Sequence, residues 1–107
     1  MRVSSLGEFG LIDKIKALCS LEQSVVKGIG DDAAVLPLDK SSYHLFTTDM
    51  LVEGVHFTRQ MAAGAVGHKA LACNISDIAA MGGVPTAAVV SLGVPKNLEV
   101  AWITELY

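Results

Sequence analysis

The longest helical pattern in the sequence lies within residues 62–83, which read Ala62-Ala-Gly-Ala-Val-Gly-His-Lys-Ala-Leu-Ala-Cys-Asn-Ile-Ser-Asp-Ile-Ala-Ala-Met-Gly-Gly83. The stretch is rich in alanine and predicts a helix from about Ala62 to Met81. The pair Gly82-Gly83 is expected to end it, because glycine is common just beyond the last helical residue. The helix is apolar on almost every side, so we expect it to be largely buried.

On both sides of this helix the pattern changes between helix and strand. Apolar residues at Leu11, Ile12, Ile15 and Leu18 recur at helical spacing. Short apolar runs rich in β-formers predict strands, and a further helix is expected after Asn97, its N-cap. The expected elements are a helix over 6–19, strands over 33–38, 43–52 and 85–94, and a helix from residue 98. This order predicts an α/β (α+β) domain and leaves its topology open.

Four aspartates stand among apolar neighbours. Asp31 and Asp32 open the first strand, Asp49 lies in the second, and Asp77 lies inside the long helix. Local propensity does not explain these placements, and an ionised carboxylate in apolar surroundings is costly unless it is paired or binds a metal. We expect few basic partners here and name Lys69, two helical turns before Asp77, as the candidate. Because hard oxygen ligands suit Mg²⁺, the pattern favours a magnesium site.

The residues alone leave a second interpretation open. Asp31 and Asp32 can be turn residues and caps, Asp49 can face solvent, and Asp77 can pair with Lys69. His56 is in the same position, since it can contact a substrate or be an ordinary half-buried residue. The Gly-Ile-Gly run at 28–30 matches neither a P-loop nor a dinucleotide fingerprint, and protein-kinase signatures are absent.

Composition excludes several classes of partner. The 107 residues carry a net charge of −3 and have no Lys/Arg run, so nucleic acid and anionic membrane are poor partners. An acidic protein is compatible with an anionic substrate when magnesium bridges the two. No apolar stretch approaches the roughly 18 residues of a membrane span, and the N-terminus lacks a signal-peptide pattern. We expect a cytoplasmic protein in which Cys19 and Cys73 are free thiols of the core.

Three motifs follow one another at consistent spacing after an opening Gly7-Glu-Phe-Gly-Leu-Ile12. They are Gly28-Ile-Gly-Asp-Asp-Ala-Ala-Val35, Thr47-Thr-Asp-Met-Leu-Val-Glu-Gly-Val-His-Phe57 and Lys69-Ala-Leu-Ala-Cys-Asn-Ile-Ser-Asp-Ile-Ala-Ala-Met-Gly-Gly-Val-Pro85. In order and spacing they resemble the N-terminal half of the thiamine-monophosphate kinases. The resemblance covers essentially the whole chain.

The resemblance implies the fold shared with aminoimidazole ribonucleotide synthetase, in which a small sheet flanked by helices pairs with its twin across a homodimer. It implies that residues 1–107 are the N-terminal domain for magnesium and ATP-phosphate binding and for dimerisation. It also implies ATP-dependent phosphorylation of thiamine monophosphate to thiamine diphosphate, with several Mg²⁺ ions and ATP as co-substrate. Transfer would be direct and in line, without a covalent catalytic residue.

The family's site residues carry over position by position. His56 matches the substrate-contacting histidine, and Asp31 is a less certain ligand. Asp32 and Asp49 also match residues that hold the nucleotide phosphates through the metal. The matches to the magnesium ligands are Asp32, Thr47, Thr48, Asp49 and Asp77.

One departure from the family concerns the end of the chain. The family's later Gly-Gly-Asp motif and C-terminal domain lie beyond Tyr107, so we expect a piece of a longer protein that is catalytically weak or inactive alone. The alternatives are another ATP-using enzyme of the superfamily, such as selenophosphate synthetase or the hydrogenase maturation factor, and a non-catalytic metal-binding dimerisation module. The run Glu53-Gly-Val-His-Phe57 favours the thiamine-monophosphate kinase.

Overall fold

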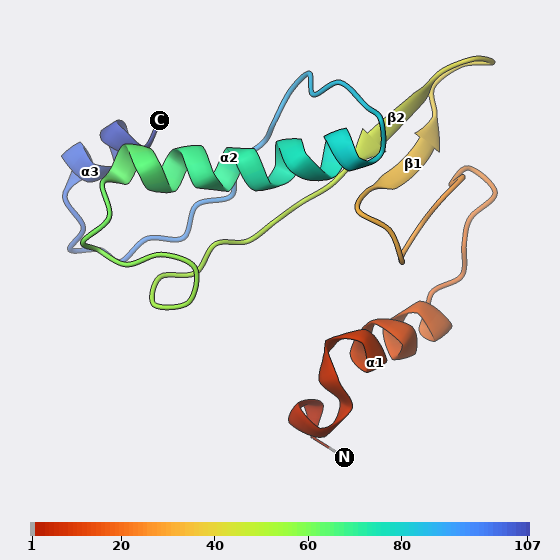
Figure 1. Ribbon diagram of the computed structural model, residues 1–107, viewed down its shortest axis with the longest axis horizontal. Helices are drawn as coiled ribbons and strands as arrows, with labels where there is room; N and C mark the ends of the chain where they lie inside the picture. Colours follow the sequence, from red (N-terminus) through yellow and green to blue (C-terminus); the bar gives the residue numbers. More distant parts are fainter. Residues whose placement is uncertain (1) are drawn as a thin grey trace. The chain divides into compact units, whose positions relative to one another are not determined.

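The computed structural model describes residues 2–107, and these form three helices and a two-stranded antiparallel sheet. This confirms the expected α/β (α+β) class. The chain divides into two compact units, residues 2–47 and Thr48–Tyr107, and each is described by itself. In chain order the elements are α1 (Val3–Leu18), β1 (Ala34–Pro37), β2 (Tyr43–Phe46), α2 (Ala63–Ala80) and α3 (Val100–Leu106) (Figure 1).

Helix α1 opens the first unit and is interrupted near its start. Gly7 has φ +73° and ψ 173°, which a residue without a side chain adopts readily, so a short first turn precedes the longer helix. The predicted helix over 6–19 is therefore confirmed from the kink to Leu18. The expectation of core thiols is wrong for Cys19, which follows the helix and is exposed, whereas Cys73 on α2 is half-buried. Both thiols are free.

The sheet of the first unit is a hairpin. Strands β1 and β2 pair antiparallel from Ala34 opposite Phe46 to Pro37 opposite Tyr43. The other edge of β1 is also bonded, since Val35 N–H donates to the Lys27 carbonyl at 2.9 Å. In the connecting turn the Asp39 carboxylate accepts the backbone N–H groups of Ser41 and Ser42, at 2.8 and 2.9 Å. These bonds satisfy backbone donors that the hairpin ladder cannot reach.

The second strand is shorter than the sequence predicts. The prediction ran to residue 52, but β2 ends at Phe46. The reason lies in its partner, because β1 begins at Ala34 and the preceding residues form the turn that contains Asp31 and Asp32. Within residues 2–107 no strand lies opposite the residues that follow Phe46, so Asp49 lies in a loop instead of a strand interior.

The second unit is built on the contact between α2 and α3. Helix α2 confirms the prediction for residues 62–81 almost to the residue, and α3 packs on its N-terminal half (Figure 1). The closest approach is at Gly67, where a Cβ would lie 1.9 Å from the Leu106 carbonyl oxygen. Trp102 of α3 is half-buried and stacks on Phe57, with ring centroids 6.4 Å apart and planes at 25°. Glycine is therefore what lets the two backbones meet.

Helix α2 is less buried than its apolar composition predicts. Only its residues Ala63 and Val66 are buried, and Leu71 is 50% exposed. The physical reason is one of length, because the 7-residue α3 cannot cover an 18-residue helix. None of the helices in residues 2–107 is both long and apolar enough to span a membrane.

Two further expectations for the second unit are wrong. Residues 85–94 belong to no helix or strand, although they are rich in β-formers, and Val89 is fully exposed. A β-forming segment becomes a strand only where a neighbouring strand exchanges backbone hydrogen bonds with it. In residues 2–107, residues 85–94 make no backbone hydrogen bond to another segment. Helix α3 begins after Glu99, not Asn97, because a turn closed by Leu98 N–H and the Pro95 carbonyl comes first.

The Asp39 turn yields a pH-dependent prediction. Hydrogen bonds from Ser42 and from the Ser41 backbone lower the pKa of Asp39 from its ordinary 3.8 to about 2. A carboxylate whose pKa is lowered by folding contributes stability that is complete above pH 3.8 and is lost as the pH falls toward 2. We expect Asp39→Ala to lower the midpoint of thermal unfolding at pH 7, with the difference from the parent disappearing near pH 2. Asp13→Ala, on exposed α1 surface, is the control, and an Asp39 effect that is independent of pH would contradict the assignment.

The α2–α3 contact yields a second prediction, with two glycines of one helix as test and control. Gly67→Ala places a methyl group against the Leu106 carbonyl and is expected to destabilise the protein by about 1–3 kcal/mol. Gly64→Ala meets only the Glu105 carbonyl at 3.4 Å, and is expected to be neutral or to stabilise by up to about 1 kcal/mol through helix propensity. Chemical unfolding of both variants measures the difference. Equal effects at the two positions would show that helix propensity, not the close approach, decides stability here.

Candidate functional site

Asp32 is the best-defined candidate residue of the first unit. It lies in the turn just before β1, and its backbone is held at both ends. Its N–H donates to the Asp31 carboxylate at 2.9 Å, and its carbonyl accepts the Thr47 hydroxyl at 3.1 Å. The hairpin brings these residues together, because Thr47 directly follows the strand that pairs with β1. The Asp32 side chain itself is exposed and, among residues 2–107, has no hydrogen-bond or ion-pair partner.

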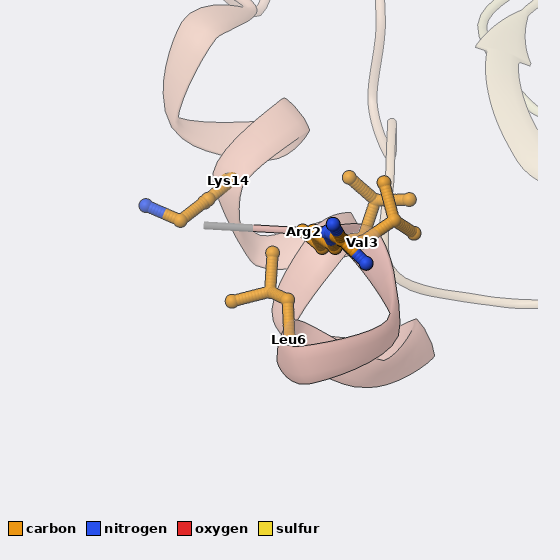
Figure 2. A pocket seen from close by; sticks show the side chains of 5 residues that line it. Arg2, Val3, Leu6 and Lys14 are labelled. Carbon is orange, nitrogen blue, oxygen red and sulfur yellow. The ribbon is translucent and has the colours of Figure 1, made fainter.

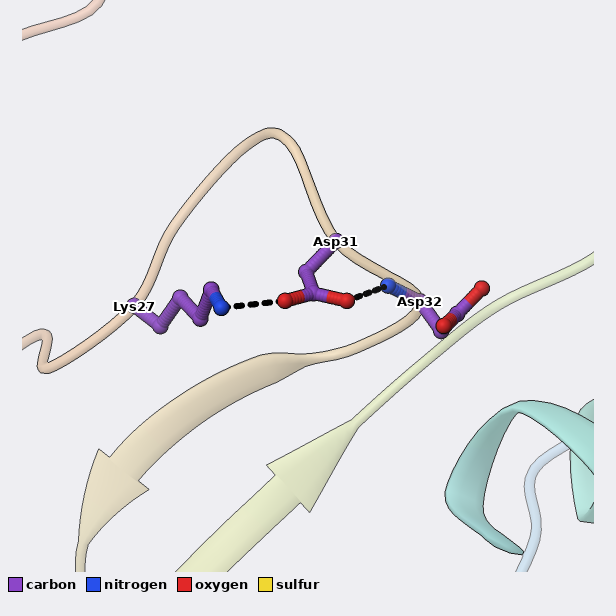
Figure 3. A network of polar contacts seen from close by, with 3 residues as sticks. All are labelled: Lys27, Asp31 and Asp32. Atoms are coloured by element: carbon purple, nitrogen blue, oxygen red, sulfur yellow. Dashed lines mark hydrogen bonds and ion pairs between the residues drawn. The ribbon is translucent and has the colours of Figure 1, made fainter. Parts of the chain in front are cut away.

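Asp31 is committed to contacts within the protein. One carboxylate oxygen accepts the Asp32 N–H and the other forms an ion pair with Lys27 (Figure 3). The hydrogen bond from Lys27, followed by that from Asp32, lowers the pKa of Asp31. The expectation of few basic partners is therefore wrong at this position. Lys27 is the residue that sequence reasoning missed, although its place four residues before Asp31 was a usable signal.

Thr48 and Asp49 begin the second unit and are both exposed. One Asp49 carboxylate oxygen accepts the N–H of Met50 at 2.8 Å, a local bond that orients the side chain in its loop. The other oxygen of Asp49 has no partner among the described residues. Asp77, the remaining acidic candidate, is half-buried in the C-terminal part of α2.

His56 sits in a tight loop whose contacts assign its tautomer. Its ring Nδ1 accepts the backbone N–H of Val52 at 2.9 Å, and the backbone N–H of His56 donates to the Val52 carbonyl at 2.9 Å. An imidazole that accepts at Nδ1 carries its hydrogen at Nε2. The exposed ring of His56 therefore offers an Nε2–H donor, which suits an anionic group.

Side chains on both sides of this loop hold its backbone in place. Lys69 of α2 donates from Nζ to the His56 carbonyl, and Arg59 pairs with Glu53 at 2.5 Å. The hydrogen bond and charge of Glu53 raise the pKa of Arg59. Within the second unit, Gly54 N–H also bonds to the Phe57 carbonyl at 2.8 Å. The loop is thus fixed independently of any ligand.

The donor set of the candidate residues fits magnesium in its chemistry. All of the predicted ligands offer carboxylate or hydroxyl oxygens, which Mg²⁺ prefers, and the Asp32 carboxylate has no competing partner in residues 2–107. Across the same residues no three His, Cys, Asp or Glu side chains converge as a metal-binding group. A pocket of the first unit, beside the start of α1, is lined by other residues (Figure 2).

Comparisons with known proteins agree with the motifs. A thiamine-monophosphate kinase of Aquifex aeolicus is 49% identical over 108 residues, which is 100% of this chain and 33% of that protein. The Bacillus subtilis thiamine-monophosphate kinase is 42% identical, over 95% of this chain and 32% of its own. A solved structure of AaThiL complexed with AMPPCP and TMP superimposes with a TM-score of 0.87 and 47% identity, over 100% of this chain and 33% of that one.

These comparisons confirm the resemblance to the thiamine-monophosphate kinases that the motifs predict. The chain spans about a third of the length of the curated relatives it matches. The model of the family described as "AIR synthase related protein, N-terminal domain" matches residues 30–107, which contain every candidate ligand together with His56. The chain therefore belongs to the family of AIR synthase related proteins, and it carries their N-terminal domain.

Proposed function

We propose that the protein carrying this chain is a thiamine-monophosphate kinase, which transfers the γ-phosphoryl group of ATP to thiamine monophosphate. The observation that carries the proposal is the match over the full length of the chain to AaThiL complexed with AMPPCP and TMP. AMPPCP is an analogue of ATP, and we interpret TMP as thiamine monophosphate, the acceptor of the proposed reaction. The relatives from Aquifex aeolicus and Bacillus subtilis carry the same activity in their names.

Several Mg²⁺ ions are part of the proposal. The residues that would hold them are Asp32, Thr47, Thr48, Asp49 and Asp77. When bound, magnesium would neutralise the charge of the phosphate oxygens, since two anionic groups must approach each other. The exposed Asp32 carboxylate supports this role, because an unpaired carboxylate is available to a hard cation. Asp32 and Asp49 would thereby hold the nucleotide phosphates as well.

The remaining chemistry asks little of the chain. The acceptor is a phosphate monoester that is already largely ionised at neutral pH, so no general base is needed, and the side chains have to orient and bind. His56 would donate from Nε2–H to an oxygen of thiamine monophosphate, because its Nδ1 is occupied by Val52. We propose direct in-line transfer without a phosphoenzyme, for which inversion at a chiral γ-phosphate is the expected stereochemistry.

The proposal extends to the organisation of the protein. Residues 1–107 would be the N-terminal domain that binds magnesium and ATP phosphates and that pairs with a second copy in a homodimer. Strand β2 supports such pairing, since it lies at an edge of the sheet and its apolar residues Tyr43 and Phe46 are exposed. We place the protein in the cytoplasm, and we expect the 107-residue chain to be weak or inactive without the rest of the enzyme.

The proposed activity is tested with Asp49→Asn in the protein that carries this chain. Thiamine diphosphate formation from thiamine monophosphate and MgATP is expected to fall by about a hundredfold or more, because the amide oxygen is a neutral and weaker ligand. Asp13→Asn removes an equal charge from exposed α1 surface and is expected to leave the rate unchanged. A parent protein that is folded but makes no thiamine diphosphate would refute the activity and direct the test to the substrates of the sibling synthetases.

The role of His56 is tested with two amides that imitate different ring nitrogens. Glutamine at 56 places a donor near the position of Nε2, whereas asparagine places an acceptor near that of Nδ1. We expect His56→Asn to keep the bond from Val52 and to raise KM for thiamine monophosphate about tenfold, and His56→Gln to raise it less. Amide exchange at Val52 should be faster in His56→Gln than in His56→Asn, because only asparagine keeps an acceptor for the Val52 N–H. Equal KM values in both variants would rule out an Nε2 contact.

A further inference from the structure

Lys27 connects strand β1 to the turn that carries Asp32. Its backbone is tied to the strand by two bonds, in which Lys27 N–H donates to the Val35 carbonyl at 3.2 Å and Val35 N–H donates to the Lys27 carbonyl at 2.9 Å. Its side chain reaches across the intervening turn to the Asp31 carboxylate (Figure 3). Lys27 is therefore bonded to the sheet through its backbone and to the turn through its ammonium group.

The Asp31 carboxylate links Lys27 to the backbone of Asp32. Both of its oxygens are used, one by Lys27 and the other by the Asp32 N–H at 2.9 Å. Asp31 is a poorer candidate for a metal ligand than Asp32, because a cation bound to its carboxylate would lie close to the positive charge of Lys27. On the far side of Asp32, the Thr47 hydroxyl holds the carbonyl at 3.1 Å. The peptide groups flanking Asp32 are thus restrained while its carboxylate is left unpaired.

We propose that Lys27 is a positioning residue for the magnesium site, which acts through Asp31 to hold Asp32 in the geometry that binds the metal. This inference rests on the proposed function, in which Asp32 is a magnesium ligand. It also assigns Asp31 to the support of the site instead of to the ligand set. Removing a group that hydrogen-bonds to a metal ligand and orients it commonly lowers metal affinity by about ten- to a hundredfold.

Simple electrostatics predicts the opposite sign, which makes the inference testable. A lysine ammonium close to a cation site repels the cation, so removal of the charge alone should tighten Mg²⁺ binding. Removal of a positioning residue should weaken it, because Asp32 then loses part of its restraint. The direction of the change in affinity therefore distinguishes the two roles of Lys27 without reference to turnover.

The experiment compares Lys27→Gln with Lys27→Arg and with Lys40→Gln in the full protein. Binding of Mn²⁺, used as a spectroscopic probe for Mg²⁺, is measured by electron paramagnetic resonance, and amide exchange of Asp32 is measured in the metal-free protein. We expect Lys27→Gln to raise the Kd for Mn²⁺ by about tenfold and to accelerate exchange at Asp32. Lys27→Arg keeps the charge and the hydrogen-bond donor, so the Kd for Mn²⁺ and the amide exchange at Asp32 should stay close to those of the parent. Lys40→Gln removes an equal charge from the hairpin turn and should change neither.

The outcomes separate this inference from the proposed function. Unchanged or tighter Mn²⁺ binding in Lys27→Gln, with a normal unfolding midpoint, overturns the positioning role. Asp32→Asn is the parallel test of the metal site itself, and a variant that binds Mn²⁺ as the parent does would overturn the proposed ligand. If Asp32→Asn abolishes binding at one site and Lys27→Gln weakens the same site, both the ligand and its support are established. A larger loss in Asp31→Asn than in Asp32→Asn would overturn the assignment of Asp31 to a supporting role.

Discussion

The antiparallel register of β1 and β2 is the constraint on which the first unit depends. By pairing Ala34 with Phe46, it brings the residues just beyond the ladder, Asp32 and Thr47, within hydrogen-bond distance. A slip of one residue would reverse the faces of the whole strand and separate them. Two features act against such a slip: the turn over residues 38–42 at the end of β1, and the contact of Val35 with Lys27 on the edge away from β2. The register of the hairpin therefore also determines where the candidate ligand Asp32 lies relative to Thr47.

In the second unit, helices hold the candidate residues in place. The 48–61 loop carries Asp49 and His56 and forms no helix or strand, so its order comes from bonds within the loop and from contacts with α2 and α3. Lys69 holds the His56 carbonyl, and Trp102 covers Phe57. The Lys69 bond comes from α2 itself, whereas the Trp102 contact comes from α3, which approaches α2 most closely at Gly67. Loops that carry functional groups on a rigid support are common, and here the support is a pair of helices.

How much the sequence predicts depends on whether a feature is local. Helix α2 was predictable almost to its ends because its composition and the Gly82-Gly83 pair are local signals. The length of β2 was not, because it is set by where β1 begins, and the 85–94 segment failed for the same reason. The candidate aspartates stood out because their neighbours in the sequence are apolar, and the candidate threonines were named through the family resemblance, whereas Lys27 was missed. Its spacing of four residues from Asp31 was a local signal for the ion pair, but its two backbone bonds to Val35 are not local and leave no pattern in the sequence.

The unpaired segment at 85–94 has a consequence for handling this chain. Residues 86–92 contain no charge, proline or glycine and are rich in β-branched and apolar side chains, and Val89 and Val90 are exposed. Short uncharged segments of this kind pair with copies of themselves when they are left uncovered. We expect this segment to lower the concentration at which the 107-residue chain stays dispersed, and a charged residue introduced at Val89 to act as a gatekeeper against fibrillar assembly.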